Sequence, residues 1–136
     1  MKRMATQPIS IVENLSLFWH DHFATSFDGV FFPQAMYQQN SVFREHCLGN
    51  FRELLRRVSF GPAMMIWLNT NSNRVNHPNE NFSRELLELF TIGVDNYTQT
   101  DVEEAARSFT GYVTNGVNTN YNYNQATGYG SYWQQR

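Results

Sequence analysis

The most informative segment of this chain is residues 77–93, which read HPNENFSRELLELFTIG. Pro78 beside the polar Asn79 is a helix-start signal, and Gly93 is a helix-stop signal. The apolar residues between them recur at helical spacing and form one face: Phe82, Leu86, Leu89 and Phe90. The segment is therefore predicted to be a helix.

The polar residues of this segment are more numerous than the folding of a short helix requires. At about 100° per residue, Asn81, Glu85 and Glu88 fall in one sector of the helix. Glu80, Arg84 and Glu88 follow one another at i,i+4 spacing, at which side chains are neighbours. Three carboxylates and an arginine on one helix predict either a functional site or a set of ion pairs.

The same segment resembles the signature of a bacterial family, domain of unknown function 1800. Blocks at residues 18–23, 39–52 and 97–112 agree with the family in the same order, so the resemblance covers about residues 11–112. It implies a mostly helical protein with no established activity. Because family members are usually several times longer, we expect the chain to correspond to the central portion of one.

The resemblance also has implications for location and partners. Full-length members are often exported, which implies an exported or periplasmic protein. Their genes often lie beside those of a sulfatase-like family, which implies a protein partner. The location of the chain as given stays open, because the basic residues near its start are followed by polar residues rather than by an apolar signal core.

Composition limits the classes of function. With 136 residues, of which 41% are hydrophobic, the chain suits one domain with a core. A net charge of -2 with interspersed signs gives no basic stripe for phosphates, so we expect no nucleic-acid partner. No apolar run approaches the roughly 20 residues of a membrane-spanning helix, so no transmembrane segment is predicted.

The chain as a whole is predicted to be all-α, an irregular multi-helix bundle with a polar C-terminal tail that could form a hairpin. Gly49 and Asn50 are expected to bend or break the second helix. Thr100 and Glu103 have the spacing of a capping box at the start of the last helix. Besides the signature segment, the predicted helices cover residues 11–23, 34–59, 62–68 and 101–109.

A change of composition divides the chain after Tyr112. Residues 1–112 are predicted to be a helical domain, a fragment of a larger family domain. Residues 113–136 are predicted to be a separate tail rich in Asn, Tyr and Gly, with no charged residue before Arg136. Residues 114–117 carry an Asn-Gly hairpin signal, so this tail is either a two-stranded ribbon or disordered.

Three histidines enter the analysis of a site. His20 and His22 point about 200° apart on a helix, so they cannot both bind one metal ion there. His22 lies on the apolar face with Phe18 and Trp19, and we favour a buried imidazole bonded to a backbone carbonyl or a carboxylate. His46 has Gly49 on its next turn, which would let another helix or a ligand approach closely.

Two functional hypotheses remain. The first is a binding or catalytic site in a cell-envelope protein, with its metal and cofactor unidentified because the Glu-x-x-His pattern of di-iron bundles is absent. Its catalytic candidates are Glu80, Glu85, Glu88, His22 and His46, and its ligand-binding candidates are Asn81, Arg84, Arg44 and Arg107. The alternative is a non-catalytic structural or protein-interaction module in which the glutamates pair with arginines: Arg44, Arg52, Arg84 and Arg107. Whether the chain is an enzyme stays open.

Overall fold

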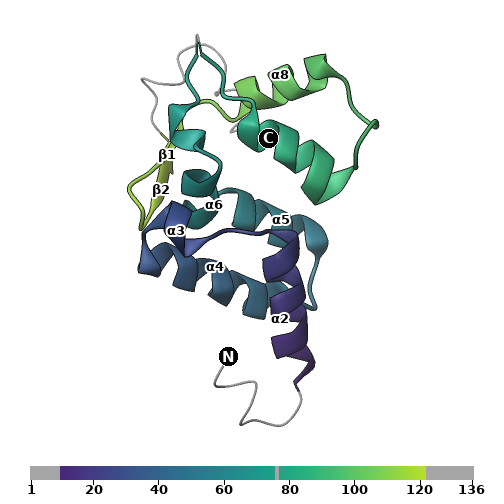
Figure 1. Cartoon of the computed structure of the whole chain (residues 1–136), viewed down its shortest axis with the longest axis vertical. Helices are drawn as coiled ribbons and strands as arrows, with labels where there is room; N and C mark the ends of the chain where they lie inside the picture. The colour runs from purple at the N-terminus through teal and green to yellow at the C-terminus, as the bar shows by residue number, and fades with distance from the viewer. Residues whose placement is uncertain (1–9, 76, 122–136) are drawn as a thin grey trace.

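The structure is a computed structural model that describes residues 10–75 and 77–121, and it is mostly helical with a small antiparallel sheet (Figure 1). The predicted helical class is therefore confirmed, with a two-stranded sheet in addition. In chain order the elements are α2 (Ile11–His22), α3 (Phe27–Val30), α4 (Pro33–His46), α5 (Phe51–Ser59), α6 (Pro62–Trp67), η1 (Thr70–Ser72), α7 (Asn81–Glu85), η2 (Leu86–Thr91), α8 (Gln99–Ser108), β1 (Tyr112–Thr114) and β2 (Thr119–Tyr121).

The helices form two groups that meet at α6. Helix α2 packs on α4, and α4 packs on α5 and α6. Helix α7 continues into η2 and packs on α8, above the first group in Figure 1. No helix within the described ranges is both long enough and apolar enough to cross a membrane.

One apolar core joins the two groups. Phe23, at the end of α2, lies with its ring 6.2 Å from the ring of Phe43 and 5.2 Å from that of Phe90. Contacts of this kind bury large areas and fix ring geometry, so they hold α2, α4 and η2 together. The buried members of the core are Phe23, Phe43, Leu54, Val58, Met64, Leu68, Phe82 and Phe90.

Helix α2 has the predicted length, but its predicted apolar face coincides only in part with the buried one. Phe18 was expected on the core side with Trp19 and His22, yet it is 57% exposed. The buried residues are Ser16 and Phe23, and the half-buried His20 between them lies with its ring 5.9 Å from that of Phe43. Trp19, from the expected face, is half-buried and packs against the core. The position of α4 decides which side of α2 is covered, and helical spacing alone left two sides with apolar residues.

The second predicted helix is broken where the sequence indicated. Helix α4 ends at His46 and α5 begins at Phe51. The Asn50 side chain accepts a hydrogen bond from the backbone N–H of Arg52 at 2.9 Å, which caps α5. The short apolar helix α6 follows directly, with Pro62 in its first turn.

The signature segment is helical but irregular. It begins as α7 at Asn81 and continues as the π-helix η2, in which the N–H of Ile92 bonds to the carbonyl of Leu87 at 3.0 Å. Each i,i+5 bond places one more residue in a turn than an α-helix does, so the side-chain positions rotate. Phe90 is therefore buried as predicted, whereas Leu89 is 57% exposed.

The capping box of α8 lies two residues earlier than predicted. Thr98 accepts from the backbone N–H of Asp101, and the Asp101 carboxylate accepts from the backbone N–H of Thr98 at 2.8 Å. This hydrogen bond to the Thr98 backbone lowers the pKa of Asp101. The helix thus begins at Gln99, because Asp101 closes the box as effectively as a glutamate does.

Replacing Thr98 with alanine should lower the free energy of unfolding by about 1 kcal/mol, because the cap loses its side-chain acceptor. Thr100→Ala is the matched control: Thr100 is exposed inside the first turn of α8 and should change stability little. Urea denaturation followed by circular dichroism compares the two variants. A larger loss of unfolding free energy for Thr100→Ala than for Thr98→Ala would contradict the observed cap and favour the one predicted at Thr100.

The start of the C-terminal tail forms a two-stranded ribbon, which is one of the two structures predicted for it. Strands β1 and β2 pair antiparallel, with Val113 opposite Asn120. Gly116 has φ +89°, and a Cβ atom there would lie 2.6 Å from the Phe32 ring. The Thr119 hydroxyl donates to the carbonyl of Phe60 at 2.7 Å, so the ribbon packs on the helices. The rest of the tail, residues 122–136, lies outside the described residues, and the division into two domains stays a prediction.

Candidate functional site

One carboxylate and one side-chain amide hold the single arginine of the signature helix. The Arg84 guanidinium donates from Nη2 to Oε2 of Glu80 and to Oε1 of Gln99, each at 2.9 Å. Gln99 in turn donates from Nε2 to the same Glu80 oxygen at 2.9 Å. Gln99 begins α8, so this closed set of bonds fixes α7 against α8.

Glu88 is also engaged within the fold. Its carboxylate accepts a hydrogen bond from the Tyr97 hydroxyl, and this bond raises the pKa of Tyr97. Tyr97 precedes the cap of α8, so the pair ties η2 to the start of that helix. Glu80 and Glu88 therefore both have partners that stabilise the packing of α8.

The asparagines around the start of α7 bond to the backbone. Asn81 donates its side-chain amide to the carbonyl of Leu68 at 3.3 Å, and its own N–H bonds to the Asn79 side chain at 3.0 Å. Asn73, in the connection between η1 and α7, is 2% exposed. Its amide donates to the carbonyl of Ala106 at 2.7 Å, and its oxygen accepts from the N–H of Asn79 at 3.1 Å.

The other candidate arginines pair away from the signature helix. Arg44 forms a two-point ion pair with Glu13 on α2, with Nη2 to Oε2 at 2.7 Å, and this hydrogen bonding raises the pKa of Arg44. Arg107 pairs with Glu104, one turn away on α8. Among these arginines, Arg84 is therefore the one that the structure places against Glu80.

His46 lies at the end of α4, away from the signature helix. Its Nε2 atom is 3.8 Å from the Glu45 carboxylate, and that nitrogen is buried with no hydrogen-bond partner among the described residues. Gly49 follows in the turn to α5, where its backbone lies against that of His46. A Cβ atom at Gly49 would lie 3.4 Å from the His46 carbonyl oxygen, an ordinary contact, and His46 does not line the cavity described next.

Glu85 and His22, two of the candidates, do come together. They line a cleft of ≈ 290 Å³ between the end of α2, the end of α6 and the signature helix. The Nε2 atom of His22 lies 3.4 Å from the carbonyl oxygen of Phe90, which is the backbone contact that we favoured for this histidine. The lining residues are Asp21, His22, Ala24, Trp67, Leu68, Glu85, Leu89 and Phe90.

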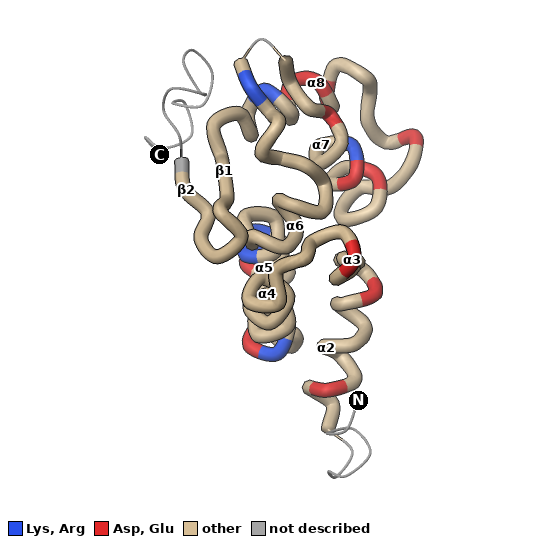
Figure 2. The backbone as a smooth tube through the Cα atoms, turned by 60° about the vertical axis from the view of Figure 1, so that its left-hand side comes forward, with Lys and Arg blue, Asp and Glu red and all other residues tan. Residues whose placement is uncertain are grey.

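Asp21 is the cleft residue that the sequence analysis missed as a candidate. Its place in the FWHDHF block was the available signal. Figure 2 shows acidic positions at the end of α2 and on the signature helix next to it. Within the described part of the chain, neither the Asp21 nor the Glu85 carboxylate has a hydrogen bond or an ion pair. No Lys or Arg lines the cleft, so its charge is negative.

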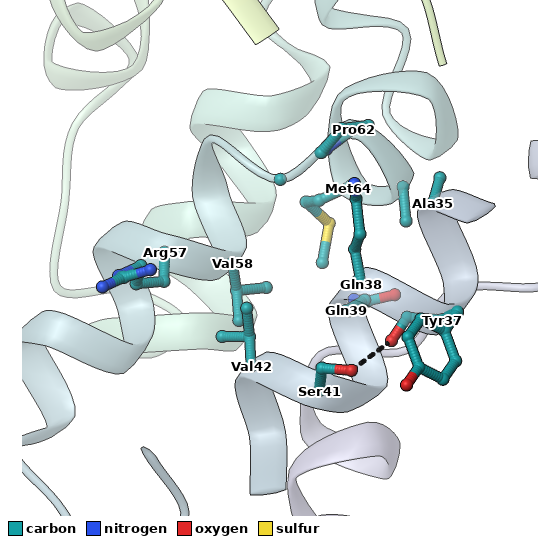
Figure 3. A pocket seen from close by; sticks show the side chains of 12 residues that line it. Ala35, Tyr37, Gln38, Gln39, Ser41, Val42, Arg57, Val58, Pro62 and Met64 are labelled. Atoms are coloured by element: carbon teal, nitrogen blue, oxygen red, sulfur yellow. Dashed lines mark hydrogen bonds between the residues drawn. The ribbon is translucent and has the colours of Figure 1, made fainter. Parts of the chain in front are cut away.

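A second cavity of ≈ 440 Å³ lies between α4 and the α5–α6 corner (Figure 3). Its walls include Val42, Val58 and Met64, and it shares no lining residue with the cleft. It is therefore a separate and more apolar space. In neither place, nor elsewhere in residues 10–75 and 77–121, do three His, Cys, Asp or Glu side chains form a group that could hold a metal ion.

The sequence matches a family model described as a protein of unknown function (DUF1800), over residues 1–133. The chain belongs to this family. The match extends beyond the range of about residues 11–112 that the sequence blocks indicated. No curated protein and no solved structure is detectably similar to the chain.

The DUF1800 match includes both walls of the cleft, since Asp21 and Glu85 lie within it. The signature helix of the family thus has two roles in this structure. Glu80, Arg84 and Glu88 bond to the start of α8 and to the residue before its cap, whereas Glu85 faces an open space beside His22.

Proposed function

We propose that this chain is a binding domain whose site is the cleft between α2, α6 and the signature helix, and that its ligand carries a positively charged group. One observation carries the proposal. Glu80 and Glu88 have partners in the fold, while Asp21 and Glu85 converge on the cleft without any. Carboxylates that no cation neutralises attract a cationic ligand.

The apolar walls of the cleft favour an organic cation. Trp67 is 39% exposed and lines the cleft together with Leu89 and Phe90. An indole face attracts ammonium and guanidinium groups, and apolar side chains cover the carbon skeleton of such a ligand. His22 is held beside them by its contact with the Phe90 carbonyl, so it would set the shape of the site.

The two hypotheses from the sequence then apply to different residues. Glu85 and His22 belong to the binding site, with Asp21 added. Glu80, Arg84 and Glu88 belong to the packing network, together with the backbone bonds of Asn81. The site would act in a cell-envelope protein, as the family resemblance implies, and its role in any reaction stays open.

A non-catalytic interaction module is the second candidate function. The observation that favours it is the closed set of bonds among Glu80, Arg84 and Gln99, which fixes the packing of α7 on α8. Exposed apolar residues near the cleft, Phe18 and Leu89, would then contact a protein partner. In this case the cleft would bind no small ligand, and substitutions of its residues would not change small-ligand binding.

Benzamidinium, an aromatic cation, should bind the cleft and shift the backbone NMR signals of residues at the end of α2 and in α7. Glu85→Gln should weaken this binding about tenfold or more, because hydrogen bonds to charged groups contribute about 1.5–3 kcal/mol. Glu45→Gln removes an exposed carboxylate of α4 and should leave the affinity unchanged. Titration with Zn²⁺ alone runs in parallel.

Three results would contradict the proposal. The first is that benzamidinium leaves the cleft signals unmoved, and the second is that Glu85→Gln binds it as well as the unmodified protein does. Stoichiometric Zn²⁺ binding that is lost in Glu85→Gln and in His22→Ala, with folding retained, would instead make the cleft a metal site. Unfolding of both variants without any ligand effect would favour the interaction module.

A further inference from the structure

We propose that the cavity between α4 and the α5–α6 corner is a second binding site, for a neutral and mostly apolar small molecule with one hydrogen-bonding group. Its volume of ≈ 440 Å³ falls within the range of about 300–1,000 Å³ that is usual for small-ligand sites. The proposal is independent of the cleft, because the two spaces share no residue.

The walls of the cavity are buried and apolar. Ala35, Val58, Ala63 and Met64 are each 0–2% exposed. Val42 completes this surface from α4. Figure 3 shows the side chains of Val42 and Val58 meeting at one end of the space and that of Met64 at the other. A ligand here would replace water on an apolar surface, which is the main favourable contribution to binding in such sites.

The charged and polar groups of the lining are mostly engaged already. Arg57 bonds through Nε to Glu53 at 3.1 Å, and Figure 3 shows its guanidinium directed away from the cavity. Gln39 is 6% exposed, accepts from the Thr25 hydroxyl at 2.6 Å and donates to the carbonyl of Phe23 at 3.3 Å. The charge of Arg57 is therefore directed away from a ligand, and each end of the Gln39 carboxamide already has a partner.

Gln38 is the exception. Its carboxamide has no hydrogen-bond partner among the residues that the structure describes, and Figure 3 shows the side chain extending from α4 toward Met64. A half-buried amide with both donor and acceptor free can hold one neutral polar group of a ligand. Tyr37, which is 73% exposed, also lines the cavity, so the apolar walls are combined with neutral polar groups and no inward-directed charge. Such a lining disfavours any ligand whose charge would lose its hydration.

Three probes of nearly the same shape test the proposal: benzamide is neutral, benzoate is an anion and benzamidinium is a cation. Titrations are followed by backbone NMR signals, so the cavity and the cleft are read separately. Benzamide should give saturable shifts in α4 and α6. Benzoate and benzamidinium should bind at this cavity more weakly than benzamide, by a factor of about ten or more, because a charged group would be desolvated there.

Variants locate the site. Gln38→Ala should weaken benzamide binding about three- to tenfold, the effect of one hydrogen bond. Gln34→Ala, an exposed glutamine one turn earlier on α4 that does not line the cavity, should have no effect. Val42→Phe should fill the space and abolish the shifts. If circular dichroism shows that Val42→Phe does not fold, Ser41→Phe, from a half-buried lining position, takes its place.

Several outcomes would overturn the proposal. One is the absence of saturable benzamide shifts in α4 and α6, and another is benzamide binding retained in the cavity-filling variants. Benzoate bound here as tightly as benzamide would mean that Arg57 turns inward and that the cavity serves anions. Equal losses in Gln38→Ala and Gln34→Ala would place the effect outside the cavity.

Discussion

Replacing Phe23 with alanine is expected to lower the free energy of unfolding by about 3–5 kcal/mol. The side chain is 1% exposed, and it belongs to the core that joins the two helical groups. Its ring contacts Phe43 on α4, Phe90 on η2 and Phe51 on α5, with centroid distances of 6.2, 5.2 and 6.4 Å. Alanine would leave a cavity that three rigid helices cannot close together.

Phe18→Ala is the control for this prediction, because it makes the same change on the same helix at a side chain that is 57% exposed. It should cost no more than about 1 kcal/mol. Urea denaturation of both variants gives the free energies, with the slope of each transition as a check on two-state behaviour. Similar losses for the two variants would mean that α2 presents the face predicted from its sequence rather than the observed one.

Replacing Asn73 with alanine should cost about 2–4 kcal/mol, since each buried polar group left without a partner costs about 1–3 kcal/mol. The substitution removes the donor to the Ala106 carbonyl and the acceptor for the Asn79 N–H. The Thr110 hydroxyl also loses an acceptor at 3.4 Å. Asn73 joins the segment before the signature helix to α8, so its loss should also loosen their packing.

Asn120→Ala supplies the matched control, because Asn120 is exposed in β2 and its side chain has no bond within the described residues. Thermal denaturation should separate the two variants by several degrees. Hydrogen exchange should show faster opening of α8 in Asn73→Ala. If Asn73→Ala were as stable as the control, the buried amide would contribute nothing that a water molecule could not replace.

Local signals predicted much of the fold. The break at Gly49 and Asn50, the proline-initiated helix α6 and the Asn-Gly ribbon each depend on residues that constrain their own backbone. The errors arose where the sequence was compatible with two neighbouring solutions. Thr98 and Thr100 both precede an acidic residue at cap spacing, and only the path of the chain from η2 decides between them.

The sequence predicted only part of the candidate site, namely the part that depends on residues close together in the chain. The pairing of Glu80 with Arg84 follows from i,i+4 spacing, so the sequence was sufficient. The approach of His22 to Glu85 could only be guessed, since 63 positions separate them in the chain. Asp21 and Asn73 were missed because an exposed-looking polar residue carries no sign of what will pack beside it.

The sequence by itself determined the family, the helical class, most helix ends and the i,i+4 pair of the signature helix, because these depend on residues within a turn or two of one another. The tertiary structure alone decided which face of α2 is buried, where the π-helix places Leu89 and Phe90, and which carboxylates stay without a partner. These outcomes depend on packing between segments that are distant in the chain, and packing is set by the shape of the whole core.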